Sequence, residues 1–433
     1  MAEKIDASPT KRLVAFVLTK DIQLDDAVLD LIDNSIDGAK HHGGTALKGF
    51  SIKLDLSDTG FLIEDNCGGI DYDRAKQYAF KFGRDEDYEL NTGPTDVVGN
   101  FGVGMKRALL KMGKQIKIKS RTKSRYFEIE IDVDKWLKSK LWEFEFSNVR
   151  DEVSPKQLCG TSISVTDLYP GVAERFKLKQ FAAGLRSVVE VKQALALQRG
   201  LSIEIGGVVA AGTEMSLMQS AKILPYYQKV VLEESRGKVD VEIYAGVEES
   251  DNDKAGWYVI CNGRTILKAD RSTVTGFGNK GDKIPAFHNQ YARFRGYVFF
   301  HSELPELLPW NTAKSNVDME HPFYRRALQL MIESMKEVFG FLNELDREKD
   351  STEQPLTKAI GNLQSVPLRK VAESKNFVIK VKTAPPKASS QLKHIKYKRP
   401  VKEVSDVMTA LGITSADEAG EETFDLYFQA IKK

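Results

Sequence analysis

The 433-residue sequence lacks the features of a secreted or membrane-spanning protein. It contains no run of about 18 apolar residues, which a membrane-spanning helix would need. Its first residues, MAEKIDASPTKR, lack the apolar core of a signal peptide. The three cysteines, Cys67, Cys159 and Cys261, lie far apart without a CxxC pair, so neither a disulfide framework nor a zinc site is expected. We therefore expect a cytoplasmic protein with reduced thiols.

The sequence also lacks an excess of charge of either sign. It has 63 Lys and Arg residues against 61 Asp and Glu residues, a formal net charge of +2. The molecule as a whole is therefore no polycation, and any nucleic-acid surface has to be local. A hydrophobic content of 42% and a charged content of 29% are typical of folded proteins. The length suggests two or three domains.

Basic residues are nevertheless concentrated in two segments. Residues 106–125 contain nine Lys and Arg residues and no acid, and residues 369–399 contain ten against Glu373 alone. Such segregation is compatible with salt-dependent binding of DNA phosphates. It is equally compatible with a solvated face and a flexible cationic linker. The sequence leaves both interpretations open.

The first 170 residues alternate between helical and strand periodicity. Apolar residues at helical spacing predict an amphipathic helix from Leu24 to about Lys40, ended by Gly43-Gly44. Helices beside several hairpin-like strands predict an α+β fold in which one sheet is covered on one face. The expected strands lie at Phe50–Leu56, Phe61–Ile63, Tyr126–Asp132 and around Ile163 and Val165.

A second α/β domain is expected over residues 171–345, after a first domain over residues 1–170. It begins with helices and ends in a long helix from about Pro322 to Leu345. Its expected strands lie near Val239–Tyr244, Trp257–Ile260 and Tyr297–Phe300.

Residues 346–390 are polar and carry four prolines, which predicts a linker. Residues 391–433 then form a small C-terminal module. It is expected to contain a strand at His394–Tyr397, a helix at Val401–Leu411 and a second helix with Ser415 as its N-cap.

Four motifs stand out in the first domain: DLIDNSIDGA (30–39), EDNCGGI (64–70), GNFGVGMK (99–106) and GTSISV (160–165). Asp30, Asn34 and Asp37 fall at i, i+4 and i+7, on the helix face opposite the apolar stripe. A polar face and a glycine turn are ordinary features in isolation. In this order and at these spacings, the four resemble the motifs of the gyrase, heat-shock chaperone, histidine kinase and MutL (GHKL) ATPases.

Within this class, the lysine after GxxGxG and the following RALLKMG are most similar to MORC ATPases and their bacterial relatives. The resemblance implies a Bergerat-type α/β sandwich ATPase domain, followed by a transducer-like α/β domain, with ATP and Mg²⁺ as ligands.

The resemblance also implies roles for single residues. Asn34 would offer its amide oxygen to Mg²⁺, with phosphate oxygens and waters completing the octahedron. Asp65 would accept a hydrogen bond from the adenine amino group, and Gly69 would let the backbone approach the base. Thr161 would help to fix adenine. Asp37, on the same helix face as Asn34, is included among the nucleotide-binding residues.

The glycine-rich loop would fold over the triphosphate and offer backbone N–H groups together with a helix N-terminus. Lys106 would neutralise phosphate charge, although a solvent-facing helix lysine is the plain alternative. The loop is neither a Walker P-loop, because GK[ST] is missing, nor a Rossmann fingerprint. Its candidate residues are Gly99, Gly102, Val103 and Gly104.

Two positions depart from the family pattern. Members that hydrolyse ATP have a glutamate as general base, whereas this chain has Asp30, shorter by one methylene or about 1.5 Å. Because a base must reach its proton, hydrolysis is expected to be slow or to depend on closure. Cys67 occupies the first glycine position of DxGxG, where a small residue is tolerable unless the backbone needs glycine-only angles.

Two segments of the second domain resemble the transducer of MutL and MORC proteins. WYVICNGR (257–264) is similar to a strand and turn, and LPWNTAK (308–314) to the loop that sends a lysine to the γ-phosphate. Lys314 is therefore the candidate phosphate sensor and, with Asp30, a catalytic candidate. The alternative is an ordinary loop lysine.

Two hypotheses follow. In the first, ATP closes two protomers into a homodimeric, MORC-like switch on duplex DNA, with a role in genome maintenance or antiviral defence by analogy. In the second, the protein is a nucleotide-sensing adaptor that hydrolyses little ATP and recruits an effector protein, which Asp30 favours.

Overall fold

The computed structural model describes residues 5, 8–83, 98–99, 102–350, 353–381, 395 and 398–432, apart from the side chain of Asp350. It divides into two compact units, Met1–Thr383 and Ala384–Lys433, which are described separately. Among these residues, we find no helix that combines the length and the apolar character needed to cross a bilayer.

An eight-stranded sheet forms the frame of the N-terminal part. Its strands are β1 (Ser51–Leu56), β2 (Gly60–Asp65), β3 (Gly113–Arg121), β4 (Arg125–Asp132), β5 (Phe146–Asp151), β6 (Gly160–Leu168), β7 (Ser202–Ile205) and β8 (Val208–Val209). Their order in the sheet is β5-β4-β3-β6-β2-β1-β7-β8. All neighbours are antiparallel except β1 and β7, which run parallel. The strands expected in the first domain are confirmed.

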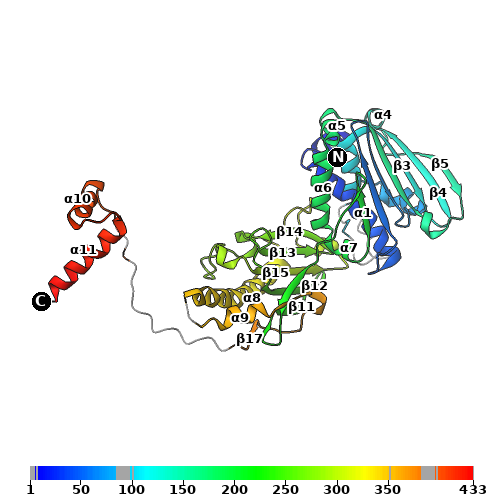
Figure 1. Cartoon of the computed structure of the whole chain (residues 1–433). Coiled ribbons are helices and arrows are strands. Elements are labelled where there is room, and N and C mark those ends of the chain that lie inside the picture. Colours follow the sequence, from blue (N-terminus) through cyan, green and yellow to red (C-terminus); the bar gives the residue numbers. More distant parts are fainter. Residues whose placement is uncertain are drawn as a thin grey trace. The chain divides into compact units, whose positions relative to one another are not determined.

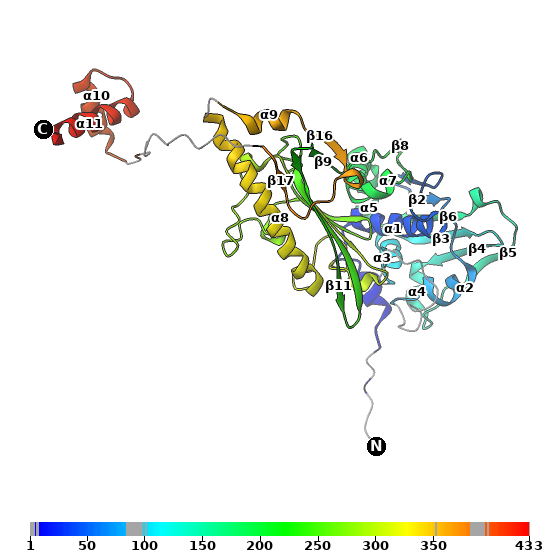
Figure 2. The ribbon, with the colours of Figure 1, turned by 90° about the horizontal axis from the view of Figure 1, so that it is seen from below.

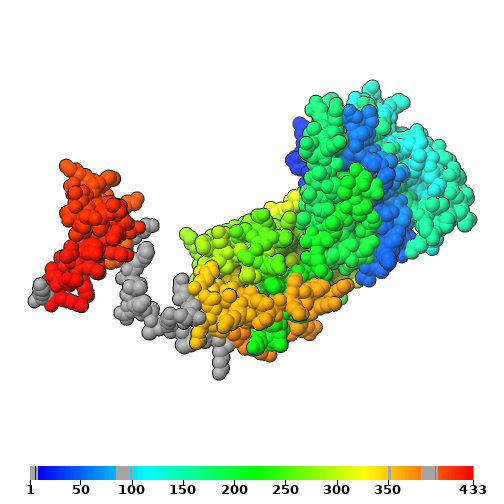
Figure 3. Space-filling view, in the orientation of Figure 1, coloured from blue at the N-terminus to red at the C-terminus, as the bar shows by residue number. Residues whose placement is uncertain are grey.

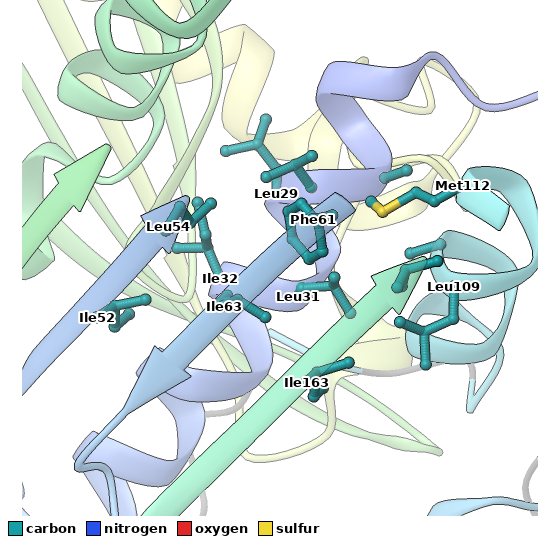
Figure 4. Packing of buried hydrophobic residues seen from close by; sticks show 14 of the residues in the cluster. Leu29, Leu31, Ile32, Ile52, Leu54, Phe61, Ile63, Leu109, Met112 and Ile163 are labelled. Atoms are coloured by element: carbon teal, nitrogen blue, oxygen red, sulfur yellow. The ribbon is translucent and has the colours of Figure 1, made fainter. Parts of the chain in front are cut away.

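Helices cover one face of this sheet, as the alternation of the strands predicted. Helix α1 (Leu24–Gly43) packs Leu29 and Ile32 against the buried residues of β1 and β2 (Figure 4). Gly44 ends it with a φ of +61°, and its N–H donates to the Lys40 carbonyl at 2.8 Å. Helix α3 (Gly104–Met112) contributes Leu109 and Met112 to the same core. The predicted helix from Leu24 is confirmed.

Three further helices follow β6 and return the chain to the first sheet. They are α5 (Pro170–Lys177), α6 (Lys179–Lys192) and α7 (Ala194–Gln198), and α5 and α6 lie on the same side of the sheet as α1 (Figure 1). Strand β7 then pairs with β1. In the space-filling view the green surface of α6 and α7 directly adjoins the blue surface of the N-terminal segments (Figure 3). The first sheet therefore continues beyond the boundary expected at residue 170, because β7 finds its partner about 150 residues earlier in the chain.

A five-stranded sheet organises the second domain. Its strands are β11 (Tyr226–Glu234), β12 (Gly237–Val247), β13 (Gly256–Cys261), β14 (Arg264–Asp270) and β15 (Phe294–His301), in the order β11-β12-β15-β13-β14. The long helix α8 (Pro322–Arg347) lies across one face of it (Figure 2). The three strands and the long helix expected here are confirmed.

The prediction of a linker over residues 346–390 is wrong for residues 353–381. This part contains α9 (Pro355–Gly361), β16 (Gln364–Pro367), which pairs with β9 (Ser216–Gln219), and β17 (Val378–Ile379), which pairs with β10 (Ile223–Leu224). Six of its apolar residues are buried against the second domain: Leu356, Ile360, Leu363, Leu368, Val371 and Phe377. A polar composition did not reveal them, because each apolar residue reaches its partners only through the tertiary fold.

The second unit is a helical hairpin. Helices α10 (Val401–Leu411) and α11 (Ala416–Ile431) are joined by Gly412, which has a φ of +70°. The Ser415 hydroxyl accepts the N–H of Glu418 at 3.4 Å, so the predicted N-cap and both predicted helices are confirmed. The strand expected at His394–Tyr397 lies outside the described residues, apart from Ile395.

Candidate functional site

Two adjoining cavities lie where α1, the start of α3 and a loop of the second domain meet. The larger measures about 640 Å³ and the smaller about 70 Å³, and Asn34, Gly38 and Gly69 line both. Every predicted site residue lines one cavity or both: Asp30, Asn34, Asp37, Asp65, Gly69, Gly99, Gly102, Val103, Gly104, Lys106, Thr161 and Lys314. The fold thus brings together residues that are up to 284 positions apart in the sequence.

Asp65 lines the small cavity at the end of β2. One carboxylate oxygen accepts the Ser35 hydroxyl at 2.6 Å, and the other accepts the N–H groups of Cys67 at 2.9 Å and Thr161 at 3.1 Å. Burial raises the pKa of Asp65, and these three hydrogen bonds oppose the rise. The site is therefore a part-buried acceptor, suited to a planar ligand that donates a hydrogen bond.

Glycines let the backbone close around this acceptor. Gly69 has a φ of +76°, and a Cβ there would lie 2.2 Å from the Arg121 carbonyl oxygen. A Cβ at Gly160 would lie 1.8 Å from the carbonyl oxygen of Asp65. Cys67 has no positive φ, so its side chain is accommodated and buried at the position where the family has a glycine.

Asp37 holds the glycine-rich loop. Its carboxylate accepts the N–H of Val98 at 2.8 and 3.0 Å and that of Gly99 at 2.8 Å. Burial raises the pKa of Asp37, while Lys40 and the two N–H donors oppose the rise. Asp37 therefore positions the start of the loop and also lines the large cavity, and its role in nucleotide binding stays a prediction.

Asn34 is the exposed residue in an otherwise buried stretch of α1, from Leu31 to Ile36. Its amide oxygen lies beside Gly99, where a Cβ would approach it to 3.3 Å. Among the described residues, no group of three or more His, Cys, Asp and Glu side chains is arranged to hold a metal ion. Mg²⁺ at Asn34 would therefore take most of its ligands from phosphate oxygens and water, which is its usual preference.

Helix α3 begins at the other end of the large cavity. Its first turn contains no acidic residue, and Lys106 is only 6% exposed although it lines the cavity. The Lys106 ammonium donates to the Ala79 carbonyl at 3.0 Å and lies 5.9 Å from the centre of the Phe82 ring. The alternative of a solvent-facing lysine is thus wrong. A helix N-terminus with a buried lysine favours an anion.

Asp30 lies beside this N-terminus, and both of its carboxylate oxygens are engaged by cations. Arg107 Nη2 is 3.0 Å from Oδ2, and Lys314 Nζ is 3.5 Å from Oδ1. Asp30 is 3% exposed. Both oxygens of this carboxylate are therefore occupied by ion pairs.

Asp33, one turn from Asp37, forms the centre of a second buried cluster. It is fully buried and accepts hydrogen bonds from Arg264 and, at 3.2 Å, from Lys314. Gln193, the residue between α6 and α7, donates to it at 2.7 Å. Burial works against the ionisation of Asp33, but Arg264 and Lys314 outweigh it and lower the pKa of Asp33. Lys314 thereby bridges the two carboxylates, and the cluster joins the two domains.

Sequence reasoning did not assign Arg107, Asp33, Arg264 or Gln193 to the site. Arg107 directly follows Lys106, and Arg264 ends the WYVICNGR motif, so both stood next to recognised residues. Arg107 pairs with Asp30 across 77 positions of the sequence, and Arg264 pairs with Asp33 across 231. No local pattern encodes ion pairs over such separations.

The loop that carries Lys314 is held in a fixed shape. Lys314 has a φ of +51°, an unusual value for a residue other than glycine. The side-chain oxygen of Asn311 accepts the N–H of Ser315 at 2.9 Å, and its main-chain carbonyl accepts the N–H of Lys314 at 2.9 Å. A β-bridge between Trp310 and Val317 closes the loop. The surrounding contacts therefore maintain a backbone conformation that is otherwise disfavoured.

A second contact between the domains lies at the end of α1. The Lys40 ammonium donates to the Asn262 carbonyl at 2.9 Å in buried surroundings. Asn262 has a φ of +45° in the turn between β13 and β14, and Arg264 directly follows this turn as the first residue of β14. The β13–β14 hairpin of the second domain thus contacts α1 at two places.

The basic segment 106–125 does not form one continuous positive surface. Lys106 and Arg107 are buried. Four further basic residues form ion pairs with acids of neighbouring elements: Lys114 with Asp134, Lys117 with Glu128 and Glu130, Arg121 with Glu152, and Arg125 with Asp151. Because these acids neutralise the strip locally, the segment offers less attraction to DNA than its sequence indicated. Much of the segment 369–399 lies outside the described residues.

Comparison with known families agrees with this geometry. Residues 22–161 match the family described as histidine kinase-, DNA gyrase B-, and HSP90-like ATPase. The matched part spans α1, the aspartate at the end of β2, the glycine-rich loop and the start of β6. No curated protein matches the chain. Residues 22–161 therefore form a GHKL-type ATPase domain, which supports ATP binding.

Proposed function

We propose that this protein binds Mg-ATP between α1 and α3 and uses it to set the contact between its two domains. The observation that carries the proposal is the position of Lys314. This lysine of the second domain lines the same cavity as Asn34 and the glycine-rich loop. A ligand in that cavity contacts both domains at once.

The nucleotide has one favoured orientation in the two cavities. Adenine fits the small cavity, where Asp65 accepts its amino group and Thr161 lies beside it. The triphosphate then extends towards the N-terminus of α3, Lys106 and Lys314, where positive charge is concentrated. Asn34 lies between the two ends and would hold Mg²⁺, which neutralises phosphate charge when bound.

Coupling between the domains follows from the ion pairs of Lys314. Asp30 and Asp33 hold its ammonium at 3.5 and 3.2 Å. A terminal phosphate would add a further anion within reach of the same ammonium, so that ATP and ADP would bias the contact differently. On the resemblance to MORC ATPases, we extend the proposal to closure of two protomers on duplex DNA, in genome maintenance or antiviral defence.

Hydrolysis is proposed to be slow. The carboxylate of Asp30 is shorter than the family glutamate, and Arg107 and Lys314 engage both of its oxygens. Activation of water by this group would require at least one ion pair to open, because a general base needs a free oxygen directed at the proton it removes.

A second candidate function is a nucleotide-sensing adaptor that recruits an effector protein. The C-terminal hairpin favours it, because its buried residues within the described part amount to Ala419 alone. Helix α11 exposes large apolar side chains at helical spacing, Phe424, Tyr427, Phe428 and Ile431, which are 43–69% exposed. A hairpin with so small a core gains stability from a protein that covers this stripe.

Binding of Mg-ATP tests the proposal directly. Titration calorimetry on the full chain is expected to detect binding of Mg-ATP, and Asn34→Ala is expected to weaken it about tenfold with Mg²⁺ present. With EDTA in place of Mg²⁺, Asn34→Ala and the wild type should bind ATP alike. Asn148→Ala, at an exposed position of β5, is the matched control. Absence of heat from well-folded wild type would exclude the proposed function.

Steady-state turnover separates the two candidates. The switch predicts slow ATP hydrolysis that duplex DNA accelerates severalfold, whereas the adaptor predicts tight binding with negligible turnover under both conditions. Phosphate release, measured with and without DNA at 50 and 200 mM salt, distinguishes them, because DNA stimulation through charge falls as salt rises.

A further inference from the structure

We infer that Arg107 is a ligand of the terminal phosphate and that Asp30 orients it. This inference rests on the proposed ATP site and assigns roles in it that differ from those predicted from the sequence. Arg107 lies in the second half of the first turn of α3, lines the large cavity, and is 8% exposed.

The hydrogen bonds of Arg107 point to a missing acceptor. Its Nη2 donates to Asp30 Oδ2 at 3.0 Å, while its buried Nε has no acceptor among the described residues. A guanidinium presents its donors as a planar fork that matches the oxygens of a phosphate. Since buried donors are nearly always satisfied in folded proteins, the free donor of a cavity-lining arginine indicates a ligand oxygen.

The charges around Arg107 also favour an anion. The two buried ion-pair clusters contain three cations, Arg107, Arg264 and Lys314, against the two carboxylates of Asp30 and Asp33. The N-terminus of α3 and the buried Lys106 add positive potential on the same side of the cavity. A terminal phosphate balances this excess where Arg107 and Lys314 both reach it.

The limited space around Asp30 explains why an aspartate stands where the family has the longer glutamate. A Cβ at Gly104 would lie 3.1 Å from Asp30 Oδ2, so the carboxylate already lies against the backbone of α3. A glutamate, longer by about 1.5 Å, would push into α3 and displace Arg107. The aspartate therefore fits a role as a positioning residue for the arginine better than a role as the base.

Nucleotide affinities test the inference. We expect Arg107→Gln to weaken Mg-ATP binding about 30-fold and Mg-ADP binding less than threefold, because a ligand of the terminal phosphate discriminates between the two. Arg107→Lys should recover part of the loss. Asp30→Asn should weaken Mg-ATP binding severalfold without affecting Mg-ADP, whereas a pure general base would lose turnover with unchanged affinity.

Arg175→Gln is the matched control, since Arg175 pairs with Asp25 of the same helix α1 at 2.9 Å but does not line the cavity. If Arg107→Gln loses Mg-ATP and Mg-ADP binding equally, or loses neither, the inference about Arg107 is overturned. The proposed function would still stand in that case, provided that the wild type binds Mg-ATP. If Arg107→Gln fails to fold, the inference is tested by the ratio of the Mg-ATP and Mg-ADP affinities in Arg107→Lys and Asp30→Asn. A wild type without any nucleotide binding would remove the proposed function as well.

Discussion

Asp65→Asn is expected to lower the affinity for Mg-ATP by about 100-fold or more, about 2.8 kcal/mol, while the protein stays folded. Asparagine keeps the size of the side chain and one acceptor oxygen. It places an amide N–H₂ where adenine would donate its own amino hydrogens, so two donors face each other in a buried cavity. Titration calorimetry with Mg-ATP measures the loss.

Folding should survive this substitution because burial already disfavours the charge of Asp65, as its raised pKa shows. The amide oxygen can still accept the N–H of Cys67 or Thr161, and the Ser35 hydroxyl can turn to accept from the new amide. Ser35→Ala, which removes one donor to Asp65, is the milder control. A thermal midpoint close to that of the wild type, together with undiminished Mg-ATP binding, would show that adenine does not lie at Asp65.

Asp33→Asn is expected to destabilise the protein by about 3–5 kcal/mol, since it leaves a buried arginine without its charged partner. Arg264 is fully buried, and two of its nitrogens, Nε and Nη2, have no acceptor in the described part of the chain even with Asp33 present. Lys314 loses the nearer of its two carboxylates as well. Chemical denaturation of the full chain measures the change in the free energy of unfolding.

Two further variants show how the change in the free energy of unfolding is to be interpreted. Asp25 lies on the same helix as Asp33 and pairs with Arg175 of α5, and the two side chains are 37% and 45% exposed. Asp25→Asn breaks this exposed pair and should cost about 1 kcal/mol or less. Asp33→Asn combined with Arg264→Met removes both partners and should recover part of the loss. If Asp33→Asn costs no more than Asp25→Asn, the buried cluster contributes little to stability and does not hold the domains together.

The stability that Asp33 contributes depends on pH, and the sign of this dependence follows from its pKa. Arg264 and Lys314 overcome the effect of burial, so the pKa of Asp33 in the folded protein is below its value of about 3.9 in an unfolded chain. The resulting stability is fully present above about pH 5 and is lost as the pH falls through the lowered pKa. The difference between wild type and Asp33→Asn should therefore be constant from about pH 5 to 8 and shrink below about pH 4.

Local patterns were sufficient for much of the first domain. The helix from Leu24 follows from apolar spacing and its end at Gly44 from a glycine that accepts a positive φ. Strand β1 follows from strict alternation, and β2 from the apolar residues Phe61–Ile63 after a turn. Each of these features is encoded within a few residues, where backbone sterics and burial of one face act directly.

The residues that line the cavities were predictable for a different reason. Asp65, Asn34 and the glycine-rich loop each carry a short motif, and the four motifs in order identified residues that the fold then gathers around two adjoining cavities. The positioning role of Asp37 was not predictable, because it depends on which N–H groups the loop brings to its carboxylate.

Other features depend on contacts between distant segments. Residues 353–381 read as a linker, yet Leu356 and Phe377 fill a core supplied by the second domain. The acids that pair with Lys114, Lys117, Arg121 and Arg125 come from β4, from the end of β5 with the residue after it, and from the short helix α4 (Val133–Lys138). These four positive charges are therefore neutralised locally.

Short motifs were thus enough to predict which residues line the pocket: the amide proposed for the metal, the carboxylate proposed for adenine, and the glycines and lysine proposed for the phosphates. Whether Asp30 has a free oxygen, and which cations flank it, was settled only when α1, α3 and the loop bearing Lys314 packed together. Ion pairs of this kind depend on distance and burial, and both are properties of the folded molecule.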